Sequence, residues 1–392
     1  MIDPARITYR LEAHLPNGAV LPLPTSGLQW EELAGELAVR VQARLPNLKT
    51  SHGYVHELLA LGTRLMLLAD WGQGPREVWR GRVWTWRYTD SGAATVEVTA
   101  YNDLIYLQQS EDDRVYPPGI SATNVIQDIL REWGIGTIGT VQLANVPLPQ
   151  LVWRGAKVSQ MLLDVLEHIF DRGGGAWILR SRLGMLEIVQ PGQNTPVYSF
   201  GTDHVEEFSD EQDMHDLVTE VRILASANDL GLGDDVPVRP EIIEVKTGRQ
   251  EFGLLRAIVR DPGPDSPVTA QQLAYRLLGE RGVPRRVRRL TAPDLPFLRR
   301  GDLIHVRAGT IDGRYAITGI QHDAERRKMQ ITIDTSGTLT YRQALVDPTI
   351  APLIGHEPDD RMDSVIDAQE RQPVTSTEFW QREWLKNNEW GT

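Results

Sequence analysis

Short runs of alternating apolar and polar residues fill the first 110 positions of the chain. Residues 7–11 alternate in this way, and Pro16-Asn17-Gly18 then supplies a turn. A similar run follows at residues 37–43, and residues 65–68 form a run that is apolar on both faces. Because successive side chains of a strand point to opposite faces, each run predicts a β-strand. Several short strands joined by turn residues predict an antiparallel barrel or sandwich over residues 1–110.

The clearest strand pair lies at residues 81–107. A turn is predicted at Asp90-Ser91-Gly92, and the return strand carries Val96 and Val98. Alternation stops over residues 100–107, which predicts a loop or short helix. On the first strand, alternation predicts Val83, Thr85 and Arg87 on one face and Trp84, Trp86 and Tyr88 on the other.

Helical spacing replaces alternation in the middle of the chain. Ser121 or Thr123 can cap a helix that ends at Gly134, and a second apolar stripe spans residues 158–170. A hairpin around Leu183-Gly184 follows. These elements predict a small α+β domain over residues 111–195. The glycines at 173–175 follow a helix and lack the lysine and hydroxyl of a phosphate loop, so they are interpreted as a helix stop.

Strands return over residues 196–345 and repeat the first region in degenerate form. Residues 62–67 resemble residues 301–306, and Gly81-Arg82-Val83 resembles Gly313-Arg314-Tyr315. Val96 and Val98 are matched with Ile331 and Ile333. The loop lengths differ, so the repeat is structural and predicts two similar β-domains in one chain.

A basic run at residues 285–289 lies within this second region. Val287 and Leu290 interleave with the arginines, which favours an exposed strand over a nucleic-acid-binding arm.

The last segment, residues 346–392, combines a linker with a tryptophan-rich helix. Thr375 and Glu378 stand at capping-box spacing. Two interpretations stay open, since these aromatic side chains can pack back onto the chain or anchor a partner protein. The candidate partner-binding residues are Phe379, Trp380, Trp384 and Trp390.

Composition and motifs narrow the function classes. The net charge of −12 argues against nucleic-acid binding as the main task, and the absence of cysteine excludes disulfides and thiolate chemistry. His52 and His56 lack the glutamate of a zinc-protease motif, and no nucleophile elbow or dinucleotide fingerprint occurs. No apolar run has the length of a membrane helix, and no secretory signal opens the chain. We expect no enzyme, no metal or other cofactor, and synthesis and folding in a cytoplasm.

The chain resembles the XkdQ/YqbQ family of baseplate hub proteins from contractile phage tails and phage-tail-like particles, within the VgrG-like hub superfamily. The resemblance covers roughly residues 28–340. Asn102 departs from it, because the family usually has aspartate after the tyrosine, and the tryptophan-rich C-terminus has no counterpart. The residues that carry it are Trp30, residues 37–41, Gly81-Arg82-Val83, residues 98–107, residues 121–135 and residues 157–189.

The resemblance implies two tube-like antiparallel β-barrel domains in each chain. With the small α+β insert and the C-terminal helical tail predicted from the sequence pattern, we expect a mainly β chain of the α+β class. The resemblance also implies a homotrimer with pseudo-six-fold symmetry, which joins a six-fold tail tube to a trimeric spike. The expected partners are a second and third copy, a tail tube or tube-initiator protein, a separate spike protein and baseplate wedge proteins. DNA is expected to pass through an acidic lumen without specific binding. The expected location is the tail baseplate of a virion, assembled in the host bacterial cytoplasm.

Two alternatives remain at this point. One is a tail-associated cell-wall hydrolase with tryptophans as sugar platforms, which the missing catalytic motifs disfavour. The other is the hub of a secretion-type or extracellular contractile injection system, which would share the fold.

Overall fold

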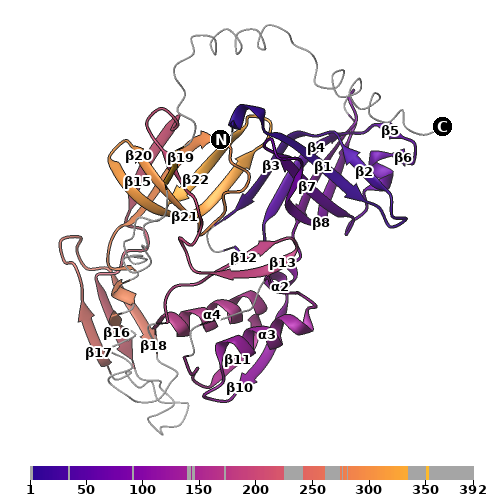
Figure 1. The fold of residues 1–392 in the computed structure, drawn as a ribbon. Helices are drawn as coiled ribbons and strands as arrows, with labels where there is room; N and C mark the ends of the chain where they lie inside the picture. Colours follow the sequence, from indigo (N-terminus) through magenta and orange to yellow (C-terminus); the bar gives the residue numbers. More distant parts are fainter. Residues whose placement is uncertain are drawn as a thin grey trace. The chain divides into compact units, whose positions relative to one another are not determined.

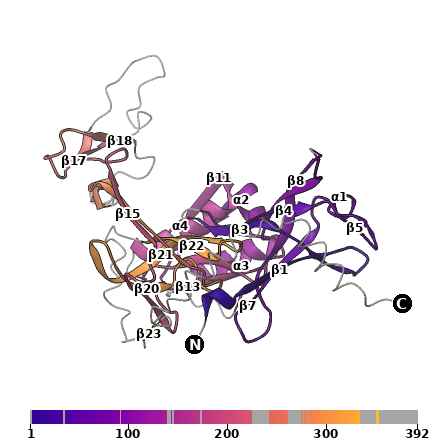
Figure 2. The same ribbon diagram turned by 90° about the horizontal axis from the view of Figure 1, so that it is seen from above.

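The computed structural model describes residues 3–33, 36–90, 92–138, 143, 146–171, 174–224, 242–260, 274–275, 277–279, 281–333 and 350–352. The chain divides into two compact units. Unit 1 comprises residues 1–208, 289–333 and 341–392, and unit 2 comprises residues 209–288 and 334–340. Figure 1 and Figure 2 show the ribbon in two orientations. Unit 1 holds three hydrophobic clusters and unit 2 holds a fourth.

The described elements are mainly strands, as the sequence predicts. The helices are η1 (Pro4–Arg6), α1 (Val55–Leu58), α2 (Ile105–Gln109), α3 (Ala122–Glu132) and α4 (Val158–Asp171). The strands up to the second helix are β1 (Thr8–His14), β2 (Val20–Leu23), β3 (Ser26–Glu32), β4 (Arg40–Pro46), β5 (Lys49–Thr50), β6 (Gly53–Tyr54), β7 (Arg64–Asp70), β8 (Arg76–Thr89) and β9 (Thr95–Tyr101). The middle strands are β10 (Glu111–Tyr116), β11 (Leu151–Lys157), β12 (Ile178–Arg182), β13 (Met185–Val189), β14 (Val197–Phe200), β15 (Glu207–Asp213) and β16 (Glu220–Leu224). The remaining strands are β17 (Ile242–Thr247), β18 (Arg256–Arg260), β19 (Arg285–Pro293), β20 (Leu303–Ala308), β21 (Ile311–Asp323), β22 (Lys328–Ile333) and β23 (Ile350–Pro352).

One large sheet links the two β-rich regions of the chain. Its main path runs β15-β19-β22-β21-β3-β4-β9-β8-β7-β1-β2. The link is β3, which pairs antiparallel with β4 on one side and with β21 on the other, with Glu32 opposite Ile320. Among the described strands no pairing closes a sheet on itself, so the predicted barrels are not confirmed. β3 and β21 hydrogen-bond to each other through their main chains and so join the two regions.

The internal repeat appears as two matching three-stranded meanders. The first is β7-β8-β9 and the second is β20-β21-β22, each antiparallel throughout. Each begins with a left-handed glycine, which adopts this conformation at no steric cost. Gly62 N–H donates to Val83 O at 2.8 Å, and Gly301 N–H donates to Ile317 O at 2.8 Å. The backbone therefore makes Val83 and Ile317 equivalent positions.

This equivalence corrects the residue pairing expected from sequence. Two residues before Val83 stands Gly81, so its counterpart is Tyr315, two residues before Ile317. The sequence comparison matches Gly81 with Gly313, which lies two positions before Tyr315. The return strands are shifted in the same way, because Trp86 pairs with Val98 and Ile320 pairs with Ile331. Val98 thus corresponds to Ile331. A shift of two keeps every side chain on its predicted face, which is why alternation alone could not detect it.

The middle of unit 1 contains the predicted helices and hairpin. Ser121 caps α3, its hydroxyl oxygen accepting from Asn124 N–H at 3.2 Å, and Gly134 follows the helix in a left-handed conformation. α4 packs on α3 and on β11 through one cluster of buried apolar side chains. Leu179 and Leu186 of the β12–β13 hairpin join the same cluster. Figure 1 shows this hairpin between the helices and the large sheet.

Unit 2 is built on a three-stranded sheet in the order β17-β16-β18. Val221 and Ile223 pack in one apolar cluster with a helical segment whose described residues include Ala274 and Leu278. The basic run forms β19, as predicted. Arg286 Nε and Arg288 Nε donate to Asp210 at 2.6 and 3.0 Å, so these cations have a carboxylate partner within their own chain.

Residues 225–241 and the predicted C-terminal tail lie outside the described residues, apart from β23. This strand pairs in parallel with β14. No helix in the described ranges combines the length and apolar character needed to cross a membrane.

Candidate functional site

The residues singled out from the sequence do not form a site in the described part of the chain. Phe379, Trp380, Trp384 and Trp390 all lie outside it. His52 and His56 are described and make local contacts, the second with its Nδ1 3.0 Å from Asn47 Oδ1. Across the described ranges no three His, Asp or Glu side chains gather as a metal site would require. The structure instead brings together three features that the sequence did not reveal.

The first feature is an arginine junction, formed by Arg299 and Arg300 in the turn before β20. The Arg300 guanidinium is buried and donates to three main-chain carbonyls. It reaches Leu33 O at 2.8 Å, Glu36 O at 2.5 Å and Leu179 O at 2.5 Å. Burial lowers the pKa of Arg300, with Glu32 opposing that change. One side chain thus ties together the end of β3, the segment after it and the β12–β13 hairpin.

Arg299 and a third arginine, Arg180, complete this junction. Arg299 pairs with Glu32, which is buried, and its Nη2 donates to Ser181 O at 2.5 Å. Arg180 donates to Asp302 Oδ1 at 2.8 Å and to Glu187 Oε2 at 2.5 Å. Burial raises the pKa of Asp302, whereas the pKa of Glu187 is lowered because Arg180 outweighs its burial. Charges this deep are stable only when paired and hydrogen-bonded, so the junction fixes one arrangement of its segments.

Apart from these three features, a separate buried polar cluster joins β1, β21 and the loop at Asp294. Tyr9 O–H donates to Asp294, and His322 Nδ1 lies 2.6 Å from the other carboxylate oxygen. Trp30 stacks on the His322 ring with centroids 4.4 Å apart. Burial, followed by the charge of Asp294, raises the pKa of Tyr9. His322 is 0% exposed. A buried histidine of this kind cannot meet a large substrate, so the cluster is a packing feature of the fold.

The second feature is the aromatic hairpin, defined here as Trp84, Trp86 and Tyr88 of β8 with Tyr106 of α2. A register shift between Val83 and Thr85 inserts one extra residue, Trp84, into the strand. Trp86 pairs with Val98 and therefore faces the same side as Val83. This corrects the expectation that Val83 and Trp86 lie on different faces.

The bulge gives the hairpin exposed aromatic side chains on both faces. Trp86 and Tyr88 point to the side of the buried Val96 and Val98, yet they remain 38% and 40% exposed. Trp84 turns to the other side, where it makes edge contacts with Tyr101 and Tyr106. Figure 2 shows β8 extending past its neighbours. Large aromatic side chains without a core to cover them are typical of protein interfaces.

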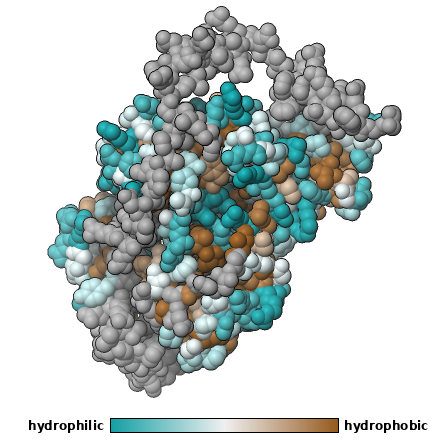
Figure 3. Space-filling view, in the orientation of Figure 1, coloured by the Kyte–Doolittle hydropathy of each residue, from teal (hydrophilic) through white to brown (hydrophobic). Residues whose placement is uncertain are grey.

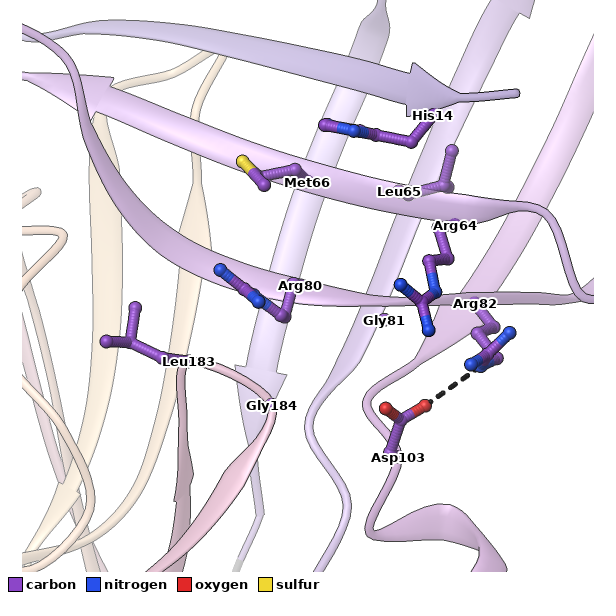
Figure 4. Close-up of a pocket in the computed structure, with 10 residues that line it drawn as sticks. All are labelled: His14, Arg64, Leu65, Met66, Arg80, Gly81, Arg82, Asp103, Leu183 and Gly184. Carbon is purple, nitrogen blue, oxygen red and sulfur yellow. Dashed lines mark hydrogen bonds and ion pairs between the residues drawn. The ribbon is translucent and has the colours of Figure 1, made fainter. Parts of the chain in front are cut away.

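The third feature is a basic pocket of about 280 Å³. It lies between β7, β8 and the turn of the β12–β13 hairpin (Figure 4). Arg64, Arg80 and Arg82 line it, with Asp103 paired to Arg82. On the face drawn in Figure 3, apolar surface gathers over the region of β12, β13 and α4, with polar surface above it. Exposed apolar side chains of these elements include Leu163, Phe170 and Leu183.

Comparison with solved structures shows that the fold is shared with tail proteins. The 43 kDa tail protein of prophage MuSo2 from Shewanella oneidensis is 14% identical, with a TM-score of 0.62 over 85% of this chain and 99% of that protein. The tail protein from Neisseria meningitidis MC58 is also 14% identical, with a TM-score of 0.62 over 85% of this chain and 98% of that one. No curated protein matches the chain in sequence.

The family assignment rests on the sequence. The profile of the YQBQ-like family matches residues 62–335, which include both meanders, the α+β insert and the three arginines of the junction. This span is more than half of the 392 residues. The chain belongs to the YQBQ-like family.

Proposed function

We propose that this protein is the structural hub of a contractile-tail baseplate. The observation that carries the proposal is the pair of equivalent meanders, β7-β8-β9 and β20-β21-β22, in one chain. Three copies of such a chain present six similar units around one axis. The resulting homotrimer can meet a six-fold tail tube on one side and a three-fold spike on the other. The shared fold with phage tail proteins supports this assignment.

The mechanism is one of shape and symmetry, with no catalytic step. Each meander would supply its strands to a tube-like barrel that closes only in the assembled ring. The arginine junction would hold the two meanders of a chain in a fixed arrangement, because Arg300 and Arg180 tie β3, the hairpin and the segment before β20 together. A hub that transmits force during contraction needs such rigidity. We infer a location in the tail baseplate, with tube, spike and wedge proteins as partners and DNA passing through the bore.

Sedimentation of the purified chain tests the proposal directly. The expected result is a species of three times the chain mass, either for the protein alone or after addition of the spike protein encoded with it. A monomer at all concentrations in both conditions would contradict the hub. Electron microscopy of the assembled particle then provides the decisive view, in which the two meanders of three chains should form one six-unit ring.

A further inference from the structure

The basic pocket concentrates positive charge in a chain whose net charge is −12. His14, Arg64 and Arg82 are direct cross-strand neighbours on β1, β7 and β8. Arg80 lies one position along the same face, opposite Met66. Like charges placed directly opposite one another destabilise a sheet, so the pair of Arg64 and Arg82 has an energetic cost. A local cost of this kind is expected where a site serves a partner.

The cations of the row are unequally compensated. Arg82 Nε lies 3.1 Å from Asp103 Oδ1, and Arg80 Nε lies 2.5 Å from Glu77 Oε1. Within the described ranges Arg64 has no hydrogen bond or ion pair to a side chain, and Figure 4 shows it between the two strands, directed toward the pocket. His14 Nε2 is buried and also makes no hydrogen bond there. Among the described residues, Arg64 is therefore the one guanidinium of this pocket without an acceptor, whereas His14 Nε2 lies 3.9 Å from Glu12 Oε2.

The opposite wall of the pocket is the turn Leu183-Gly184. Gly184 lies against the stem of Arg80, so closely that a Cβ added there would stand 2.9 Å from Arg80 Cδ. Leu183 has a φ of 53°, a left-handed conformation that costs a leucine about 1–2 kcal/mol. The turn thus holds an apolar side chain at the rim in spite of its backbone cost. Met66 supplies a second apolar contact on the other side.

We propose that this pocket receives a glutamate or aspartate side chain from a protein partner in the assembled tail. A guanidinium binds a carboxylate through two parallel hydrogen bonds, and Arg64 is the donor group available for it. The volume of about 280 Å³ lies at the lower limit of ligand pockets and suits one side chain. Leu183 and Met66 match the hydrocarbon stem of a glutamate, which a nucleic-acid phosphate lacks. The source of the carboxylate, a second copy or another tail protein, rests on the proposed hub function, whereas the anion preference does not.

The test uses a fluorescent 12-residue peptide of alternating Glu and Ala. A Gln–Ala peptide of equal length is the uncharged control. Binding is followed by anisotropy at low ionic strength. The expected result is that the Glu peptide binds at least tenfold more tightly than the Gln peptide, and that Arg64→Gln removes this preference. Arg64→Lys should give an intermediate affinity, because it keeps the charge and loses the planar fork.

Arg326→Gln is the matched control. Its side chain is 77% exposed at the β21–β22 turn, and the substitution removes the same unit of charge. It should change the affinity less than twofold. Equal affinity for both peptides, or equal weakening by the two variants, would overturn the proposal. A labelled (dT)12 strand that binds through Arg64 more tightly than the Glu peptide would also overturn it, in favour of phosphate.

Unaltered thermal melting shows that each variant is folded before binding is compared. A trimer without peptide preference would leave the hub function standing and reject the pocket. A monomer that prefers the Glu peptide would support the pocket and reject the hub function. If Arg64→Gln also weakens self-association of the unlabelled protein, the carboxylate comes from a second copy, whereas unchanged self-association assigns it to another tail protein.

Discussion

Arg300 shows at the scale of one residue how this fold is held together. Its guanidinium satisfies three carbonyls from two distant segments, and no other side chain type offers so many donors in a fixed plane. Removing it would leave these three carbonyls without the donors that the guanidinium supplies. Such losses exceed the effect of surface substitutions by a wide margin.

We expect Arg300→Ala to lower the free energy of unfolding of unit 1 by about 3–5 kcal/mol. Arg300→Lys should recover a part of it, because one ammonium cannot reach all three carbonyls. Urea unfolding followed by tryptophan fluorescence measures both. Arg326→Ala serves as the control and should stay within about 0.5 kcal/mol of the wild type. A loss for Arg300→Ala no larger than for Arg326→Ala would show that the junction does not stabilise the fold.

Leu183 adopts a left-handed backbone conformation that is unfavourable for a leucine. Both residues of the Leu183-Gly184 turn have positive φ, as a two-residue hairpin of this type requires, and asparagine suits the first position far better than leucine. Leu183→Asn should therefore raise the unfolding free energy by about 1 kcal/mol. Leu163→Asn is matched in chemistry and nearly in exposure, at 41% against 42%, but lies in the helix α4. It should lower the stability instead. A lower melting temperature for Leu183→Asn would contradict the expectation.

At the scale of elements, the sequence revealed the strands and helices but not the irregularities within them. Alternation located β8, β9 and the turn between them, and helical spacing located α3 and α4. The bulge at Trp84 could not be seen, because an inserted residue leaves the local pattern of residue types unchanged while it exchanges the faces beyond it. The two-residue error in pairing the meanders has a different cause, because a shift of two keeps every side chain on its predicted face and leaves the alternation unchanged.

The ionic contacts were beyond prediction for a different reason. Arg299 and Glu32 stand 267 positions apart, and each residue by itself resembles an ordinary surface charge. The pairing depends on β21 lying beside β3, which neither strand specifies alone. The pocket has the same character, since its walls come from β7, β8 and a hairpin about a hundred residues later. Its one visible signal was Leu183-Gly184, which the sequence marked only as a turn.

In unit 2, Asp210 of β15 pairs with two arginines of β19. Hydrogen bonding to Arg286, followed by Arg288, lowers the pKa of Asp210 to about 2. Because the folded pKa is below the unfolded value near 4, the stabilisation is present above pH 4 and is lost as the pH falls toward 2. Solvent screening limits it to about 1 kcal/mol or less.

Hydrogen exchange of peptides that cover β15 and β19 measures this contribution. At pH 7, Asp210→Asn should exchange faster than the wild type in both strands. The difference should shrink below pH 4 and vanish near pH 2. Asp203→Asn, at an exposed carboxylate of unit 1, should leave these two strands unchanged. A difference between Asp210→Asn and the wild type that persists at pH 2 would mean that the charge is not the cause.

For the whole molecule, the two meanders differ in what their outer ends present. In the first, Trp86 and Tyr88 lie on the same face as the buried Val96 and Val98, but they stay partly exposed at the end of the hairpin. The equivalent positions of the second are Ile320 and His322, both buried within the chain. The second meander is therefore covered by β3 and its neighbours, whereas the first keeps an uncovered aromatic end. In the proposed ring of alternating first and second meanders, that end would contact the next chain.

The aromatic hairpin should accordingly control self-association. The double variant Trp86→Ser with Tyr88→Ser should weaken trimer formation at least tenfold in sedimentation, because aromatic anchors dominate interface energies. Its thermal stability as a monomer should fall only slightly, since both side chains are already part exposed. Phe170→Ser removes an aromatic side chain of 48% exposure from α4 and should leave association unchanged. Equal weakening by both variants would indicate a general loss of apolar surface, and an unaffected double variant would place the contact between chains elsewhere on the ring.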